Sequence, residues 1–156
     1  MKMGKKKIFG IIVLVIILGV GGFATSKKIS PLSLMLWGET NNSSGLAIEG
    51  YDPVAYQTEG TARPGNTDYQ VSWQNVSWNF SSPQNMAMFQ AAPEKFVPQY
   101  GSYCAFAVYN GVTADTDPEV WHVADNKLYL FLEESAKTDW LAADALATSD
   151  SNWSNG

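Results

Sequence analysis

Residues 69–80 read YQVSWQNVSWNF, and this stretch predicts a β-hairpin. Large apolar residues alternate with polar ones on both sides of Gln74 and Asn75, which is the period of a strand with one buried face. A two-residue turn there pairs Trp73 with Val76, Val71 with Trp78 and Tyr69 with Phe80. All six apolar side chains then lie on one face, so the register agrees with the pattern.

A second hairpin is predicted in EVWHVADNKLYLF, residues 119–131, with its turn at Asp125 and Asn126. This register pairs Val123 with Leu128, His122 with Tyr129 and Trp121 with Leu130. Trp121, Val123, Leu128 and Leu130 then form one apolar face, and His122 lies on the other face, opposite Tyr129.

Three helices are predicted between and after the hairpins. Ser82 and Pro83 are typical of a helix start, and the short helix that follows presents Met86 and Phe89 and ends at Pro93. The segment SYCAFAVYN, residues 102–110, is apolar nearly all round, which favours a buried helix that ends at residues 110–111.

The third helix is predicted from about Glu133 to Thr148, with Trp140, Leu141 and Leu146 facing inward. Small antiparallel hairpins packed against short helices give the α+β class. No internal repeat is visible, and we expect one domain over residues 46–148, followed by a flexible tail over residues 149–156.

The N-terminus carries an export signal, because lysines at positions 2, 5, 6 and 7 precede an uncharged apolar run over residues 8–24. A retained transmembrane anchor and a signal peptide over residues 1–24 both fit this run. Lysines before it outnumber Lys27 and Lys28 after it, which predicts that the chain beyond it lies outside the cytoplasm. We expect a linker over residues 25–45 and a domain that is tethered to the membrane on its periplasmic or extracellular side, or secreted if the signal is cleaved.

The exported part is strongly acidic. Six of the ten basic residues precede Ile29, so four remain against all fifteen acidic residues, a formal charge of −11. Such a charge repels phosphate groups, so it excludes nucleic acids and anionic lipid headgroups as partners.

Three segments carry a family resemblance: GLAIEGYDPVAY at residues 45–56, WNFSSPQNMAMFQAAPEKFVPQYGSYCAFAV at 78–108, and DPEVWHVADNKLYLF at 117–131. In this order they resemble the exported, single-domain branch of the YHS-domain family. The resemblance implies a link to heavy-metal and copper handling through cysteine ligands. Where that family carries these cysteines, this chain has Ala55, Ser81 and Asn85, so we do not expect the family's usual metal site.

Cys104 is the only cysteine and His122 the only histidine. The segment YGSYCA around Cys104 resembles a Y-G-G-Y-C-A signature of that branch, with Ser102 in place of a glycine. Three roles are open for the thiol: a copper or zinc ligand beside His122 and a carboxylate, a nucleophile with His122 as its base, or a buried core atom. For His122 the alternative is a partly exposed sheet residue.

Four tyrosines are candidate ligand-binding residues. Tyr51 and Tyr56 flank the turn expected at Asp52 and Pro53. With Tyr100 and Tyr103 they predict either a pocket for a small ligand or a core whose hydroxyls reach the surface.

The sequence therefore predicts an exported YHS-type binding domain, either metal-associated through copper or zinc or an accessory protein for a small ligand. Catalysis is not expected, because none of the G-x-S-x-G, H-E-x-x-H or phosphate-binding glycine motifs occurs. The alternative is a structural module that contacts a membrane-protein partner and holds no metal.

Overall fold

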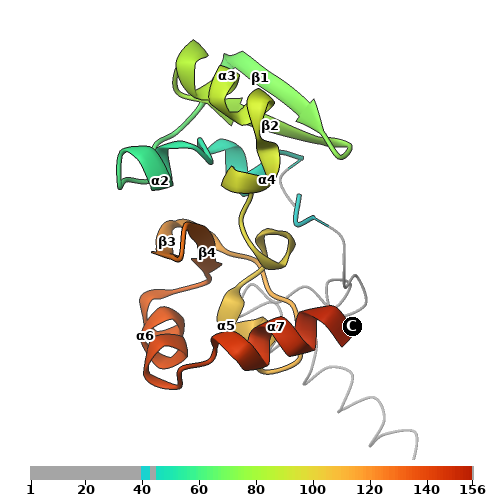
Figure 1. Cartoon of the computed structure of the whole chain (residues 1–156), viewed down its shortest axis with the longest axis vertical. Coiled ribbons are helices and arrows are strands. Elements are labelled where there is room, and N and C mark those ends of the chain that lie inside the picture. Colours follow the sequence, from blue (N-terminus) through green and yellow to red (C-terminus); the bar gives the residue numbers. More distant parts are fainter. Residues whose placement is uncertain (1–39, 43–44, 156) are drawn as a thin grey trace, which may run out of the picture.

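The computed structural model describes residues 40–42 and 45–155, so the predicted membrane segment over residues 8–24 and most of the predicted linker lie outside it. Within the described ranges, no helix combines the length and the apolar character needed to cross a membrane. The described residues form two small antiparallel hairpins and several short helices (Figure 1), which confirms the α+β class.

The elements follow one another in two runs. The first contains η2 (Ala47–Gly50), α2 (Ala55–Thr58), β1 (Asn66–Trp73), β2 (Val76–Phe80), α3 (Pro83–Ala91) and α4 (Pro93–Phe96). The second contains η3 (Tyr100–Ser102), α5 (Ala105–Tyr109), β3 (Asp117–Ala124), β4 (Lys127–Phe131), α6 (Glu134–Ala142) and α7 (Leu146–Asn155).

Both predicted hairpin turns are present. Gln74 and Asn75 have φ of 51° and 62°, and Asp125 and Asn126 have φ of 51° and 57°. Two consecutive left-handed residues give the turn whose twist matches that of two antiparallel strands. The β3–β4 register matches all three predicted pairs.

The β1–β2 register is predicted correctly at two pairs and wrongly at the third. Phe80 pairs with Asn66 rather than Tyr69, because the register shifts between Asn66 and Gln70. The Asn66 side chain accepts a hydrogen bond from the Asp68 amide at 2.9 Å, a local turn that competes with the strand ladder. Tyr69 nevertheless packs against the same core as Phe80, so the predicted common face is kept.

The hairpin β3–β4 lies between the helices α2 and α4 on one side and α6 on the other (Figure 1). Its strand β4 is buried on both faces and contributes to two hydrophobic cores. Leu128 and Leu130 pack into the first core, while Tyr129 and Phe131 pack into the second. The first core includes Trp78, Phe80 and Phe89, and the second includes Val108, Ala136 and Trp140. This central position explains why strand β4 is apolar at four consecutive positions.

The third predicted helix is two helices in the structure. The chain leaves helical geometry between α6 and α7, where Asp144 has φ of 47°. The side-chain amide of Asn152, on α7, donates to the backbone carbonyls of Val108 and Tyr109 at 3.0 and 2.9 Å, and so caps the end of α5. Residues 149–155 are therefore part of a packed helix rather than a frayed tail. Leu141, predicted to face inward, is 46% exposed, because it lies on the outer face of α6 while its neighbour Trp140 is buried.

The two runs of elements repeat one arrangement that was not visible in the sequence. Each begins with three left-handed residues, at positions 48–50 in η2 and 100–102 in η3. A tyrosine follows each turn, and its amide donates to the first carbonyl of that turn: Tyr51 to Ile48 at 2.9 Å and Tyr103 to Tyr100 at 3.0 Å. A short helix, a hairpin and another helix come next in both runs.

This repeat places Asp52 and Cys104 at corresponding positions. The Asp52 amide donates to the Arg63 carbonyl at 2.9 Å, and the Cys104 amide to the Ala114 carbonyl at 3.0 Å. Each side chain then accepts from the residue just after its hairpin: Asp52 Oδ2 from the Ser81 amide at 2.9 Å, and Cys104 Sγ from the Leu132 amide at 3.4 Å. The two side chains therefore occupy equivalent places with different chemistry.

Candidate functional site

Asp52 is a fully buried carboxylate whose hydrogen bonds are all made inside the protein. Its Oδ1 accepts from the Val54 amide at 2.9 Å, and its Oδ2 accepts from the Ser81 amide, the Ser81 hydroxyl and the Asn85 side chain at 2.9, 2.7 and 2.7 Å. Ser81 and Asn85 stand where the resemblance places cysteines, and Ala55, the third such position, is fully buried at the start of α2. The structure thus uses these positions to hold a carboxylate in place.

Cys104 precedes α5 and is 2% exposed. Burial raises the pKa of its thiol, and this effect outweighs the backbone amides of Ala107, Leu132 and Phe106, which lower it. A thiol with a raised pKa holds its proton at neutral pH and is a poor nucleophile. The geometry therefore favours a neutral thiol that contacts what lies next to it.

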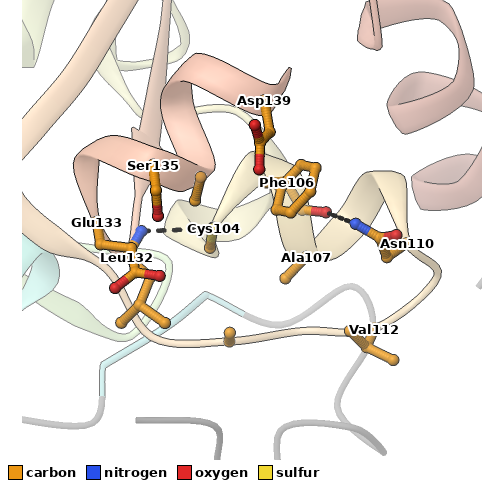
Figure 2. Close-up of a pocket in the computed structure, with 11 residues that line it drawn as sticks. Cys104, Phe106, Ala107, Asn110, Val112, Leu132, Glu133, Ser135 and Asp139 are labelled. Atoms are coloured by element: carbon orange, nitrogen blue, oxygen red, sulfur yellow. Dashed lines mark hydrogen bonds between the residues drawn. The ribbon is translucent and has the colours of Figure 1, made fainter. Parts of the chain in front are cut away.

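A cavity of about 310 Å³ lies next to Cys104 (Figure 2). Its apolar wall includes Phe106, Ala107, Val112 and Leu132. Its edge is polar, because it includes Glu133, which precedes α6, and Ser135 and Asp139 within α6. Figure 2 shows the Asp139 carboxylate beside the Phe106 ring. Of the described residues that line it, none is basic. The cavity is thus apolar inside and negatively charged at its rim.

Cys104 and His122, the residues predicted for a copper or zinc site, do not belong to a cluster of three ligands in the described part of the chain. Within residues 40–42 and 45–155, no three His, Cys, Asp or Glu side chains gather closely enough to hold a metal ion. Cys104 bridges Leu130 on β4, whereas His122 lies on β3, partly exposed and outside the cavity lining. His122 faces Tyr129 across the hairpin, as predicted for a sheet residue.

The four candidate tyrosines belong to two separate cores, so they do not share one pocket. Tyr51 and Tyr56 pack in the first core, and Tyr100 and Tyr103 in the second. The hydroxyl of Tyr51 donates to Glu119 Oε1 at 3.1 Å, that of Tyr56 to the Pro118 carbonyl at 2.9 Å, and that of Tyr100 to Asp150 Oδ1 at 2.8 Å. These contacts fix β3 and α7 onto the rest of the domain.

The buried tyrosines make the protein sensitive to alkaline pH. Burial raises the pKa of Tyr129 to about 12, and burial also raises the pKa of Tyr56 and Tyr100 above the ordinary value of 10.0. A pKa that is higher in the folded state stabilises the fold below the unfolded pKa, and this contribution is lost as the pH rises through the folded pKa. We expect the free energy of unfolding to fall by about 1 kcal/mol per tyrosine between about pH 8 and pH 11.

Urea unfolding at a series of pH values measures this decrease. Tyr129→Phe should remove about a third of it, while Tyr69→Phe on β1 serves as the matched control and should leave it unchanged. A free energy of unfolding that stays constant up to pH 11 in the parent protein would contradict the prediction.

Sequence reasoning singled out Cys104 but not the α6 residues that complete its cavity. The missed residues include Glu133, Ala136 and Asp139. One signal was available, because Ser81 and Leu132 each come directly after the phenylalanine that ends a predicted hairpin, and both precede a helix. Aligning those two points would have placed α6 against Cys104.

No family model matches the chain, and neither the curated proteins nor the solved structures contain a significantly similar protein. The resemblance to YHS domains therefore rests on the sequence motifs alone. Function has to be sought in the chemistry of the two cores and their cavities.

Proposed function

We propose that this chain is an exported binding domain of YHS type, which takes up a small amine with a compact apolar body in the cavity beside Cys104. The observation that carries this proposal is an open cavity of about 310 Å³ with an apolar wall and two carboxylates at its rim. Well-packed proteins leave few voids larger than a water molecule, and this volume is at the lower end of known ligand pockets.

A comparison of the two runs of elements, η2 to α4 and η3 to α7, supports a binding role for this cavity. In the first run Asn85, near the start of α3, donates a hydrogen bond to Asp52 and so fills the place that corresponds to the cavity beside Cys104. The residue at the same place in α6 is Ala136, whose methyl group leaves the space open. The second half thus lacks the polar side chain that closes the first.

The negative charges at the cavity rim favour a ligand that carries a positive charge. Glu133 and Asp139 stand at the rim, and the exported part as a whole carries a formal charge of −11 from the residues after position 28. A cationic head is attracted to this rim, while an apolar body gains by leaving water for the wall of Phe106 and Leu132. The protonated Cys104 thiol contacts the ligand and takes no part in chemistry.

We retain the predicted export signal in this proposal and assign no metal ion to the domain. Residues 8–24 hold the domain at the outer face of the membrane, or direct its secretion if they are cleaved; this part rests on the sequence pattern. The interaction-module alternative has less support, because Met88 and Leu141 are the exposed large apolar side chains of the described part and come from separate helices, α3 and α6.

Calorimetric titration of the purified full chain with 2-phenylethylamine and with 3-phenylpropionate tests the proposal. We expect millimolar or tighter affinity for the amine and at least tenfold weaker binding of the anion. Asp139→Asn should weaken amine binding at least fivefold, because it removes one rim charge. Asp144→Asn is the matched control: Asp144 is exposed and does not line the cavity, so its loss should change little.

Ala136→Leu provides an independent arm, because the larger side chain fills the cavity and should abolish binding. Equal affinity for the amine and the anion would overturn the assignment of the ligand's charge. Absence of binding by both would overturn the proposed function.

A further inference from the structure

A second cavity, of about 270 Å³, opens where the chain enters the domain from its N-terminal side. Thr40 lines it, together with Trp73 and Gln74 from the hairpin β1–β2 and Trp153 from α7. Figure 1 shows residues 40–42 between the turn of that hairpin and the C-terminal end of α7. We call it the entry cavity, and it is separate from the cavity beside Cys104.

The chain is fixed at the edge of the entry cavity by two hydrogen bonds. The backbone amide of Asn41 donates to the Gly101 carbonyl at 2.7 Å, and the side-chain amide of Asn41 donates to the Ser102 carbonyl at 3.5 Å. Gly101 itself lines the cavity. Because Thr40 and Asn41 are held there, the residues just before them start from the cavity wall.

Those preceding residues form an apolar run that ends in a tryptophan. The stretch LSLMLW, residues 32–37, carries five apolar side chains in six positions. Only Gly38 and Glu39 separate Trp37 from Thr40, so the two Cα atoms lie within about 11 Å of each other even in a fully extended chain. Trp37 is therefore always within reach of the entry cavity, and its ring gains free energy by leaving water.

The entry cavity offers a neutral wall with aromatic surface. Trp73 packs against the first core and Trp153 against the second, and both are only partly buried. Gln74 and Gln99 reach solvent at least in part and carry amide carbonyls that can accept a hydrogen bond. Of the described residues that line the cavity, none is charged. An uncharged aromatic side chain with one donor fits this wall.

We infer that the entry cavity takes up the indole ring of Trp37 from the same chain. Aromatic rings attract one another edge to face, which Trp73 and Trp153 allow. The indole N–H is a donor only, and a glutamine carbonyl accepts it. Because Trp37 is joined to the cavity wall through three peptide bonds, its effective concentration there is high, and a modest contact is enough to keep it bound.

Binding of Trp37 has a consequence for the predicted membrane anchor. Residues 25–36 are then the free connection to the predicted membrane segment over residues 8–24. A flexible chain of this length spans about 20 Å on average, so the domain is held close to the membrane surface. The inference uses no residue of the proposed amine site, so either can fail without the other.

Disulfide trapping in the purified full chain tests where the segment lies. Leu36→Cys combined with Gln74→Cys keeps Trp37 and places one thiol on each side of the contact, so we expect rapid cross-linking within one chain under mild oxidation. Leu36→Cys with Asp68→Cys is the matched control, because Asp68 is exposed on the same strand but does not line the cavity. It should cross-link at least tenfold more slowly. Adding Trp37→Ala to the first pair should slow its reaction at least fivefold.

Thermal unfolding gives an independent readout. Trp37→Ala should lower the Tm by several degrees, while Leu32→Ala, in the same apolar run but farther from Thr40, should change it little. If Trp37 and Trp153 touch, their substitutions are not additive. Trp153→Ala should therefore lower the Tm less in the Trp37→Ala background than in the parent protein.

Three outcomes overturn the inference. The first is an equal rate of cross-linking for the Gln74 and Asp68 pairs. The second is a strictly additive loss of Tm in the double variant of Trp37 and Trp153. The third is a cross-link that forms between two chains rather than within one, which would assign the cavity to Trp37 of a second copy.

Discussion

Replacing Asp52 with alanine is expected to lower the free energy of unfolding by about 3–5 kcal/mol, a large part of the stability of a domain of this size. The substitution removes an acceptor that satisfies four donors in a fully buried place. Each buried donor left without a partner costs about 1–3 kcal/mol. The same network connects the turn at Pro53 to the start of α3, so several elements lose their attachment together.

Urea denaturation monitored by tryptophan fluorescence measures this loss. Asp52→Asn should cost less than the alanine variant, because one oxygen remains, but it turns an acceptor into a donor that faces Ser81 and Asn85. Asp68→Ala is the matched control, since Asp68 is exposed on β1 and its loss should change the free energy by less than about 0.5 kcal/mol. A loss below about 1 kcal/mol for Asp52→Ala would contradict a structural role and make Ser81 and Asn85 candidates for ligand binding again.

The second large effect is expected at Trp140, where substitution by alanine should cost about 3–5 kcal/mol. The indole is 3% exposed and lies 5.1 Å from the Tyr129 ring and 5.5 Å from the Phe131 ring. Its Nε1 donates to Ser149 Oγ at 2.9 Å, so Trp140 also holds α7 against α6. A cavity would remain, and the Ser149 hydroxyl would keep only its bonds to backbone carbonyls, such as that of Ala145 at 2.9 Å.

Trp140→Phe separates these two contributions, because it keeps part of the ring packing and removes the hydrogen bond. Leu141→Ala is the matched control: Leu141 is the next residue, is equally apolar and is 46% exposed, so its loss should cost less than about 0.5 kcal/mol. If Trp140→Ala and Leu141→Ala lose the same free energy in thermal unfolding, Leu141 faces the core, as predicted from the sequence, and the structure is wrong about that face of α6.

The hairpins and the hydrogen bonds of Asp52 differ in how far the sequence could predict them. The hairpins follow from local rules, because apolar alternation fixes the faces of a strand and the turns at residues 74–75 and 125–126 fix the register. The cap at Ser82 is equally local: its hydroxyl accepts from the Asn85 amide at 3.1 Å. Asp52 was predicted to initiate a turn, but its bonds to Ser81 and Asn85 join residues about 30 positions apart and leave no local signal.

The errors have the same physical origin. Helical propensity runs on past Ala142, and the packing of α7 onto α5 accompanies the break in the helix. The register shift in β1 depends on the small side-chain turn at Asn66. The repeat of the two halves is carried by backbone hydrogen bonds and left-handed turns, while the side chains at matching positions differ, as Asp52 and Cys104 do.

The sequence by itself determined the α+β class and the two hairpins with their turns. For Cys104 it left three roles open, one of which was a buried core atom. Tertiary structure alone decided what surrounds that thiol. It kept His122 out of the cavity lining and placed the carboxylates of Glu133 and Asp139 at the cavity rim. The reason is that backbone geometry responds to near neighbours in the chain, whereas a cavity is made by side chains that only packing brings together.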